Sequence, residues 1–139
     1  MKRKEKRFIR NNPHRPVQNL QQTLNYYHDV LGFSDEWTWQ NKDGNITDGG
    51  IRRDDLRLIF GEDPEIVAVI NGYEKSRLPL LWFVDNIDEI YKEFLERKVE
   101  ITDSLKEHPY GLREFAIIDI NGYYIRVAEP ANEEETMRM

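Results

Sequence analysis

The feature that most constrains the fold of this 139-residue chain is an internal repeat with a spacing of 67 residues. The segment PVQNLQQTLNYY, which starts at Pro16, resembles FVDNIDEIYKEF, which starts at Phe83. The same shift places the run 56–60 on the run 123–127, and both runs alternate apolar residues with others. One constant offset through early and late segments indicates two copies of one supersecondary unit.

Both copies predict a short strand that leads into an amphipathic helix. Asn19 and Asn86 stand before the two helices, and asparagine is a favoured N-cap residue. Asn86 with Glu89 has the spacing of a capping box, and Gly32 is suited to end the first helix. The apolar stripes are Leu20, Leu24, Tyr27 and Leu31 in the first helix and Ile87, Tyr91 and Phe94 in the second.

Strand-like stretches fill the remainder of each copy, which gives the order β-α-β-β-β twice. They are SDEWTWQNK and ITDGGIRR in the first half and VEITDSL and LREFAIID in the second. We therefore predict an α+β fold with module one at 8–61, a linker at 62–78, module two at 79–130 and a tail at 131–139. Two such modules would form a curved eight-stranded mixed sheet with helices outside and a concave, pocket-forming face.

Composition excludes several functional classes. The formal net charge of -6 argues against a nucleic-acid-binding protein, although a basic cluster lies near the N-terminus. The absence of cysteine excludes disulfides and thiolate metal sites. No apolar run is long enough for a membrane span, and MKRKEKR is not followed by the apolar core of a signal peptide. We expect a cytoplasmic protein without nucleic-acid or membrane partners.

Two short motifs contain backbone or charge features that need an explanation. The segment DINGYYIRVAEP, from Asp119 to Pro130, predicts a turn at Asn-Gly and then a strand in which Arg126 alternates with apolar residues. A guanidinium in the middle of a half-buried strand requires an anionic partner. The run Asp48–Gly50 predicts a flexible turn or a bulge.

Several segments together resemble the glyoxalase / bleomycin-resistance / extradiol-dioxygenase superfamily. They are NLQQTLNYYHDVLGF, RRDDLRLIF, VDNIDEIYKEF and PYGLREFAIIDINGYYIRVAEP, and the resemblance spans residues 8 to 130. It implies paired βαβββ modules, usually in a homodimer, with ligand sites in the concave faces.

The resemblance also implies where a metal site would lie. In the superfamily's metalloenzymes, His or Gln on the first strand of a module and Glu on the last strand bind a divalent ion. Here the first-strand positions fall at about Asn12 and Pro79, and the last-strand positions fall at Ile59 and Arg126. Proline and isoleucine do not coordinate metals, asparagine is a weak ligand, and arginine is a cation. His14 could share a face with Asn12, but a lone histidine makes no site, so we expect neither metal nor cofactor.

The preferred interpretation is therefore a member of the metal-free, bleomycin-resistance-like branch. We expect a homodimer that binds a small molecule in a groove. The candidate ligand-binding residues are Trp37, Trp39, Arg57, Tyr110, Arg113, Tyr124 and Arg126. Arg126 could meet an anionic ligand or pair with Glu114, and the two tryptophans could clamp a flat ligand or pack in a core or dimer interface. Trp82 is expected to pack beneath a helix.

Two other functions stay open at this point. The chain could be an enzyme of the same superfamily, either metal-dependent with displaced ligands or metal-independent with His108 as a general base. A solvated loop histidine is the simpler interpretation of His108. The third possibility is a scaffold whose concave face is filled by its own aromatic side chains.

Overall fold

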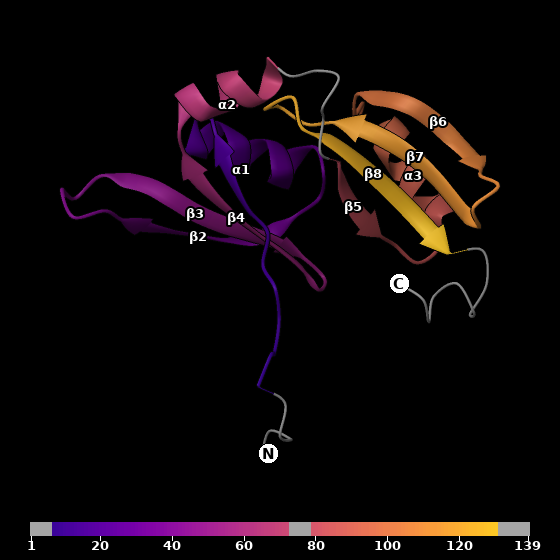
Figure 1. Cartoon of the computed structure of the whole chain (residues 1–139), viewed down its shortest axis with the longest axis horizontal. Helices are drawn as coiled ribbons and strands as arrows, with labels where there is room; N and C mark the ends of the chain where they lie inside the picture. The colour runs from indigo at the N-terminus through magenta and orange to yellow at the C-terminus, as the bar shows by residue number, and fades with distance from the viewer. Residues whose placement is uncertain (1–6, 73–78, 131–139) are drawn as a thin grey trace.

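The computed structural model describes residues 7–72 and 79–130, and it shows two βαβββ modules side by side (Figure 1). Module one consists of β1 (His14–Val17), α1 (Leu20–Asp29), β2 (Ser34–Gln40), β3 (Ile46–Arg53) and β4 (Leu56–Glu62). Module two consists of β5 (Leu80–Phe83), α3 (Ile87–Glu96), β6 (Ile101–Glu107), β7 (Leu112–Ile118) and β8 (Tyr124–Pro130). These elements confirm the predicted α+β fold of two modules. The expected linker contains one further helix, α2 (Pro64–Asn71), whereas the tail, residues 73–78 and the basic residues before Arg7 lie outside the described ranges.

The eight strands belong to two four-stranded sheets with the orders β1-β4-β3-β2 and β5-β8-β7-β6. In each sheet the first strand pairs parallel with the last strand of its module, and the other pairs are antiparallel. His14 lies opposite Ile59, and Leu81 lies opposite Arg126. Both members of the second pair are 67 residues beyond those of the first, so the sheet register reproduces the repeat found in the sequence.

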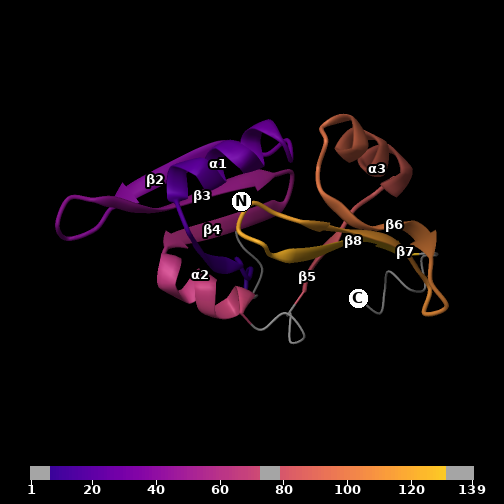
Figure 2. The same ribbon diagram turned by 90° about the horizontal axis from the view of Figure 1, so that it is seen from above.

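One hydrophobic core joins the two modules. The helices α1 and α3 lie on the same side of the sheets (Figure 2), and the buried residues of both modules form one contiguous cluster. Trp82 on β5 packs against Tyr27 of α1 and Phe33, with ring centroids 6.3 and 5.5 Å apart. Trp82 therefore lies beneath a helix as expected, but the helix is that of the other module.

Polar contacts link the turn between β7 and β8 to module one. The Tyr27 hydroxyl donates to the Asp119 carboxylate at 2.7 Å, and the Gln18 amide donates to the Asn121 side chain at 2.9 Å. The Tyr123 hydroxyl also donates to the carbonyl of Pro16. The eight predicted strands are present, and they are divided between two four-stranded sheets where we predicted one eight-stranded sheet. Gly122 has the positive φ of 84° that the predicted Asn-Gly turn requires.

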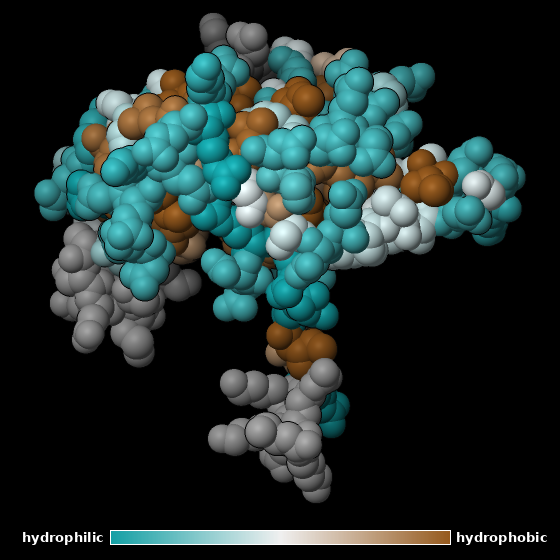
Figure 3. Space-filling model, turned by 180° about the vertical axis from the view of Figure 1, so that it is seen from behind, coloured by the Kyte–Doolittle hydropathy of each residue, from teal (hydrophilic) through white to brown (hydrophobic). Residues whose placement is uncertain are grey.

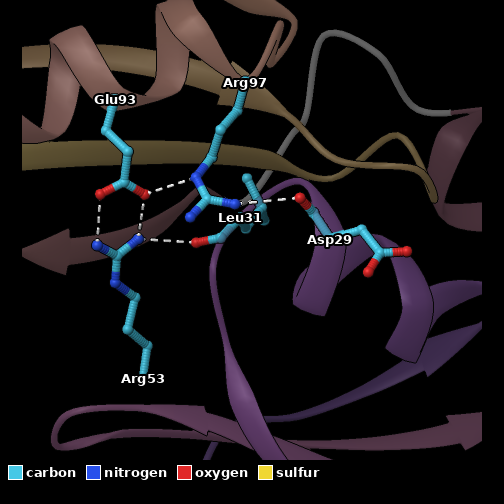
Figure 4. A network of polar contacts seen from close by, with 5 residues as sticks. All are labelled: Asp29, Leu31, Arg53, Glu93 and Arg97. Carbon is cyan, nitrogen blue, oxygen red and sulfur yellow. Dashed lines mark hydrogen bonds and ion pairs between the residues drawn. The ribbon is translucent and has the colours of Figure 1, made fainter.

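A charged network also crosses the boundary between the modules (Figure 4). The two terminal nitrogens of Arg53 on β3 donate to the two carboxylate oxygens of Glu93 on α3 at 2.7 and 2.8 Å. Arg97 contacts the same carboxylate at 3.0 Å. Arg53 and Arg97 also donate to the carbonyls of Leu31 and Asp29 at the end of α1. Two cations thus neutralise one carboxylate and satisfy the exposed carbonyls of a helix C-terminus.

The two helices that follow β1 and β5 are capped by carboxylates from the last strands. Glu62 accepts from the amide of Leu20 at 2.9 Å, and Glu129 accepts from the amides of Asn86 and Ile87 at 2.9 and 3.4 Å. The predicted capping box at Asn86 is wrong, because Asn86 has a left-handed backbone with φ 56° and its side chain makes no capping bond. The predicted cap at Asn19 is confirmed.

Residues 7–13, which precede β1, extend away from the two modules (Figure 1). Hydrophobic surface is exposed on this segment (Figure 3), where Phe8 is 99% exposed. Within residues 7–72 and 79–130, the structure contains no helix with the length and hydrophobicity of a membrane span.

Candidate functional site

Each sheet has one face covered by α1 or α3 and one face without these helices. The face without these helices carries the candidate site, and we call it the outer face. On β8, Ile125 and Val127 are fully buried beneath the helices, so Tyr124 and Arg126 lie on the outer face. A pocket of about 250 Å³ opens there, and we call it the module-two pocket. Its lining includes Asp103, Lys106, His108, Tyr110, Glu114, Ala116, Tyr124 and Arg126.

Arg126 is held by Glu114 in a bidentate pair. The Arg126 Nε donates to Oε2 of Glu114 at 2.7 Å, and Nη2 donates to Oε1 at 2.9 Å. The two residues lie on adjacent strands, since Ala116 is opposite Arg126 and Glu114 is opposite Ala128. Of the two partners considered for Arg126, the structure places Glu114 against it. Glu114 is only 6% exposed, so this contact balances a buried carboxylate.

Hydrogen bonding determines the charge state of this pair. Burial alone would raise the pKa of Glu114, but hydrogen bonds from Arg126 and Tyr110 lower it below its usual value. The hydrogen bond to Glu114 raises the pKa of Arg126 further above its usual value. Glu114 is therefore an anion and Arg126 a cation over the physiological pH range.

Tyrosine hydroxyls bind the carboxylates of the module-two pocket. The Tyr110 hydroxyl donates to Glu114, and the Tyr124 hydroxyl donates to Asp103. Burial, with the hydrogen bond to Asp103, raises the pKa of Tyr124 to about 12, and burial with the Glu114 contact raises that of Tyr110. Both phenols are thus protonated donors. The ring of His108 stacks on Tyr110 with centroids 4.9 Å apart.

A β-bulge in β6 brings two charged residues onto the outer face together. Asp103 lies opposite Ala116, and Lys106 lies opposite Glu114, so three steps along β6 match two steps along β7. In a regular strand, residues three apart point to opposite faces. The extra residue therefore places Asp103 and Lys106 on the same face of the sheet. We did not predict either residue, because strand alternation cannot reveal a bulge.

Arg113 does not belong to the module-two pocket. Its guanidinium donates to both carboxylate oxygens of Asp88 in the first turn of α3, at 2.8 and 3.1 Å. Asp88 lies on the helix-covered side of the sheet, so Arg113 points away from the outer face. The structure thus brings together Tyr110, Tyr124 and Arg126 of the residues predicted for module two, and separates Arg113 from them.

Module one presents an aromatic platform on its outer face. A Cβ atom at Gly50 would lie 2.2 Å from Cζ2 of Trp37, so the indole lies directly over this glycine. Gly50 is opposite Ile59, and Trp39 on the same face is 42% exposed. The predicted flexible turn at Asp48–Gly50 is wrong, because these residues lie within β3, whereas the alternative of a bulge agrees with a register irregularity next to Asp48, where Trp39 faces Asp48 and Gln40 faces Ile46. Glycine serves there to leave room for the Trp37 ring.

Arg57, His14 and Asp48 also lie on the outer face of module one. Leu58 and Phe60 are buried beneath α1, so Arg57 and Ile59, which alternate with them along β4, both lie on the outer face. His14 is opposite Ile59, and its Nε2 is 4.0 Å from the Asp48 carboxylate. Apart from Arg113, the predicted site residues of the two modules therefore lie on the outer faces of two separate sheets.

The residues at the superfamily's metal positions do not fit a metal. In the structure, the first-strand neighbours of Ile59 and Arg126 are His14 and Leu81, two residues beyond the expected Asn12 and Pro79. Leucine and isoleucine have no donor atom, and the Arg126 guanidinium is a cation. No three His, Asp or Glu side chains converge as a metal site within the part of the chain that the structure describes.

The sequence model of the Glyoxalase/Bleomycin resistance protein/Dioxygenase superfamily matches residues 12–127. The chain belongs to this superfamily. The match covers both modules, and the resemblance seen in the sequence is confirmed. No curated protein matches the sequence.

Solved structures of superfamily proteins share the fold at low sequence identity. A glyoxalase-related enzyme from Clostridium phytofermentans superposes with a TM-score of 0.70 at 16% identity, over 92% of this chain and 99% of that chain. The bleomycin resistance determinant encoded on transposon Tn5 gives 0.68 at 18% identity, over 90% and 100%. The bleomycin-binding protein of Streptomyces verticillus, in complex with copper(II)-bleomycin, gives 0.63 at 21% identity, over 91% and 98%. At these identities the likeness shows the fold alone.

Proposed function

We propose that this superfamily member is a metal-free, homodimeric small-molecule-binding protein that holds its ligand against the outer faces of its sheets. The observation that carries the proposal is the bidentate pair of Arg126 with Glu114, at the position where a metalloenzyme of the superfamily would carry a glutamate ligand. A guanidinium at that position repels a divalent cation. The pocket beside it is open to a ligand.

Exposed apolar side chains on the outer faces support binding and dimerisation there. Leu81 and Phe83 on β5 share the outer face with Arg126 and are 38% and 41% exposed, and Trp39 is exposed on module one. Exposed apolar groups gathered on one face are typical of ligand and protein interfaces. The Trp37 platform over Gly50 offers a flat surface on which a planar ligand can stack.

The proposal also draws on proteins of similar fold. One neighbour is a bleomycin-binding protein, and another is a bleomycin resistance determinant. Bleomycin is therefore the first probe for this chain. We expect metal-free bleomycin, or another drug with a planar ring system, to change the tryptophan fluorescence in a saturable way.

The test combines three measurements on the purified chain. Metal analysis should find no stoichiometric Ni, Zn, Mn or Fe, and sedimentation should give the mass of a dimer. Replacement of Trp37 by alanine should weaken ligand binding about tenfold, the size expected for loss of one aromatic stacking contact. The matched control is Ile120→Ala, which removes an exposed apolar side chain from the turn between β7 and β8. A stoichiometric metal, a monomer, or equal effects of the two substitutions would contradict the proposal.

A further inference from the structure

We propose that the module-two pocket selects a small organic anion and binds its carboxylate, an inference that rests on the proposed ligand-binding function and adds the class of ligand. The pocket contains two carboxylates, Asp103 and Glu114, and three basic side chains, Lys106, His108 and Arg126. Near neutral pH its formal charge is close to balanced, so charge counting alone does not identify the ligand. The hydrogen bonds that these groups already make do distinguish an anion from a cation.

The acceptors of the pocket are largely occupied. Both oxygens of Glu114 accept hydrogen bonds from Arg126, and one also accepts from Tyr110. One oxygen of Asp103 accepts from Tyr124. Each phenol has a single hydrogen, so these two tyrosines have no donor left for a ligand. Among the carboxylate oxygens of the pocket, only one, on Asp103, accepts no hydrogen bond from a described residue, and a cationic ligand there would have Lys106 and Arg126 nearby to repel it.

The donors of the pocket are not occupied to the same extent. Arg126 uses Nε and Nη2 for Glu114 and has the Tyr110 hydroxyl beside its guanidinium, while Nη1 makes no hydrogen bond to a described residue. Lys106 lies opposite Glu114 across the sheet, yet no carboxylate in the described ranges is within 4.0 Å of its ammonium group. The Lys106 ammonium group and the Arg126 Nη1 thus both lie in the lining of the module-two pocket and can donate hydrogen bonds to a ligand. A carboxylate accepts hydrogen bonds from both and has the charge that complements them.

The β6 bulge is what places the Lys106 ammonium group on the outer face, at the pocket. Without the extra residue between Asp103 and Lys106, the lysine would point to the side of the sheet that α3 covers. The volume of about 250 Å³ is below the ~300–1,000 Å³ of pockets for drug-sized ligands, so it fits a small anion or one end of a larger molecule. Tyr110 and His108 provide a stacked aromatic wall for an unsaturated body.

The experiment compares three probes that share a phenyl ring and differ in charge: benzoate, benzamide and benzamidinium. Binding to the full chain is followed by NMR titration near neutral pH, through the backbone amide signals of Glu114, Ala116 and Arg126. We expect benzoate to bind at least about tenfold more tightly than benzamidinium, with benzamide between them. Lys106→Gln should weaken benzoate binding about fivefold and leave benzamide binding unchanged.

A matched variant separates a local contact from a general effect of charge. Lys92→Gln removes the same charge from α3, on the other side of the sheet, and should leave the affinity for benzoate unchanged. Equal or tighter binding of benzamidinium would overturn the inference while a small-molecule site remains. Equal effects of Lys106→Gln and Lys92→Gln would also overturn it. If none of the three probes shifts the pocket signals, the anion site is refuted, and the bleomycin, metal and mass measurements still decide the proposed function separately.

Discussion

Replacement of Glu93 by glutamine tests whether the charged network between the modules stabilises the fold. The Glu93 carboxylate accepts two hydrogen bonds from Arg53 and lies 3.0 Å from Arg97. The glutamine side chain keeps the shape and one acceptor oxygen, but it removes the charge. The two guanidinium groups, both bound to carbonyls at the end of α1, would then face each other without a counter-charge.

The expected loss of unfolding free energy follows from how exposed the side chains of the network are. Hydrogen bonds to charged groups contribute ~1.5–3 kcal/mol each when shielded from water, whereas fully exposed ion pairs contribute ~0–1 kcal/mol. The side chains of Arg53 and Glu93 are 26% and 28% exposed, which places this network between the two cases. We expect Glu93→Gln to lower the free energy of unfolding by about 1–3 kcal/mol.

Urea unfolding followed by circular dichroism, with linear extrapolation, measures this loss. The control is Asp35→Asn, which breaks the more exposed pair with Arg52 within module one and should cost less than about 1 kcal/mol. A double-mutant cycle of Glu93→Gln with Arg53→Met should show a coupling energy of about 1 kcal/mol or more. Equal losses for Glu93→Gln and Asp35→Asn, or zero coupling with Arg53, would refute a stabilising role of the network.

The pH dependence provides an independent check of the same network. The hydrogen bond from Arg53 lowers the pKa of Glu93 in the folded chain. A carboxylate with a lowered pKa contributes stability above its unfolded pKa, and this contribution is lost as the pH falls through the folded value. The difference in unfolding free energy between wild type and Glu93→Gln should therefore be full near neutral pH and shrink in acid. A difference that stays constant into strong acid would contradict this assignment.

Two further substitutions test the outer faces. Gly50→Ala should displace the Trp37 indole, lower the free energy of unfolding and change tryptophan fluorescence. The same substitution in a Trp37→Ala background should cost much less stability. Equal losses in both backgrounds would show that the ring does not lie over Gly50. Arg126→Met should leave the buried Glu114 carboxylate without its cation and lower the unfolding free energy by about 2–4 kcal/mol. A second substitution, Glu114→Gln, in the same chain should restore part of this loss. An unchanged urea midpoint for Arg126→Met would contradict a stabilising role of the Arg126–Glu114 pair.

The sequence alone predicted the architecture, because the signals that carry it are local. The helical stripes, the Asn19 cap and the Asn-Gly turn each depend on residues close together in the chain, and the repeat of 67 residues shows that the same local pattern occurs twice. The non-ligand residues Ile59 and Arg126 were also evident from the sequence once the resemblance placed them. Side-chain periodicity further put Tyr124 and Arg126 on one face of their strand, as the structure shows.

Only the tertiary structure decided which partner each polar side chain meets. Glu114 contacts Arg126 because β7 and β8 pair in one particular register, and Glu129 caps α3 in place of Asn86 because β8 ends beside that helix. The β6 bulge places Lys106 on the outer face, where strict alternation would not put it. Periodicity and caps follow from the backbone geometry of a few residues, whereas register, bulges and ion pairs depend on the packing of distant strands. The sequence thus determined two modules with a charged strand, and the packing of the strands decided what that charge binds.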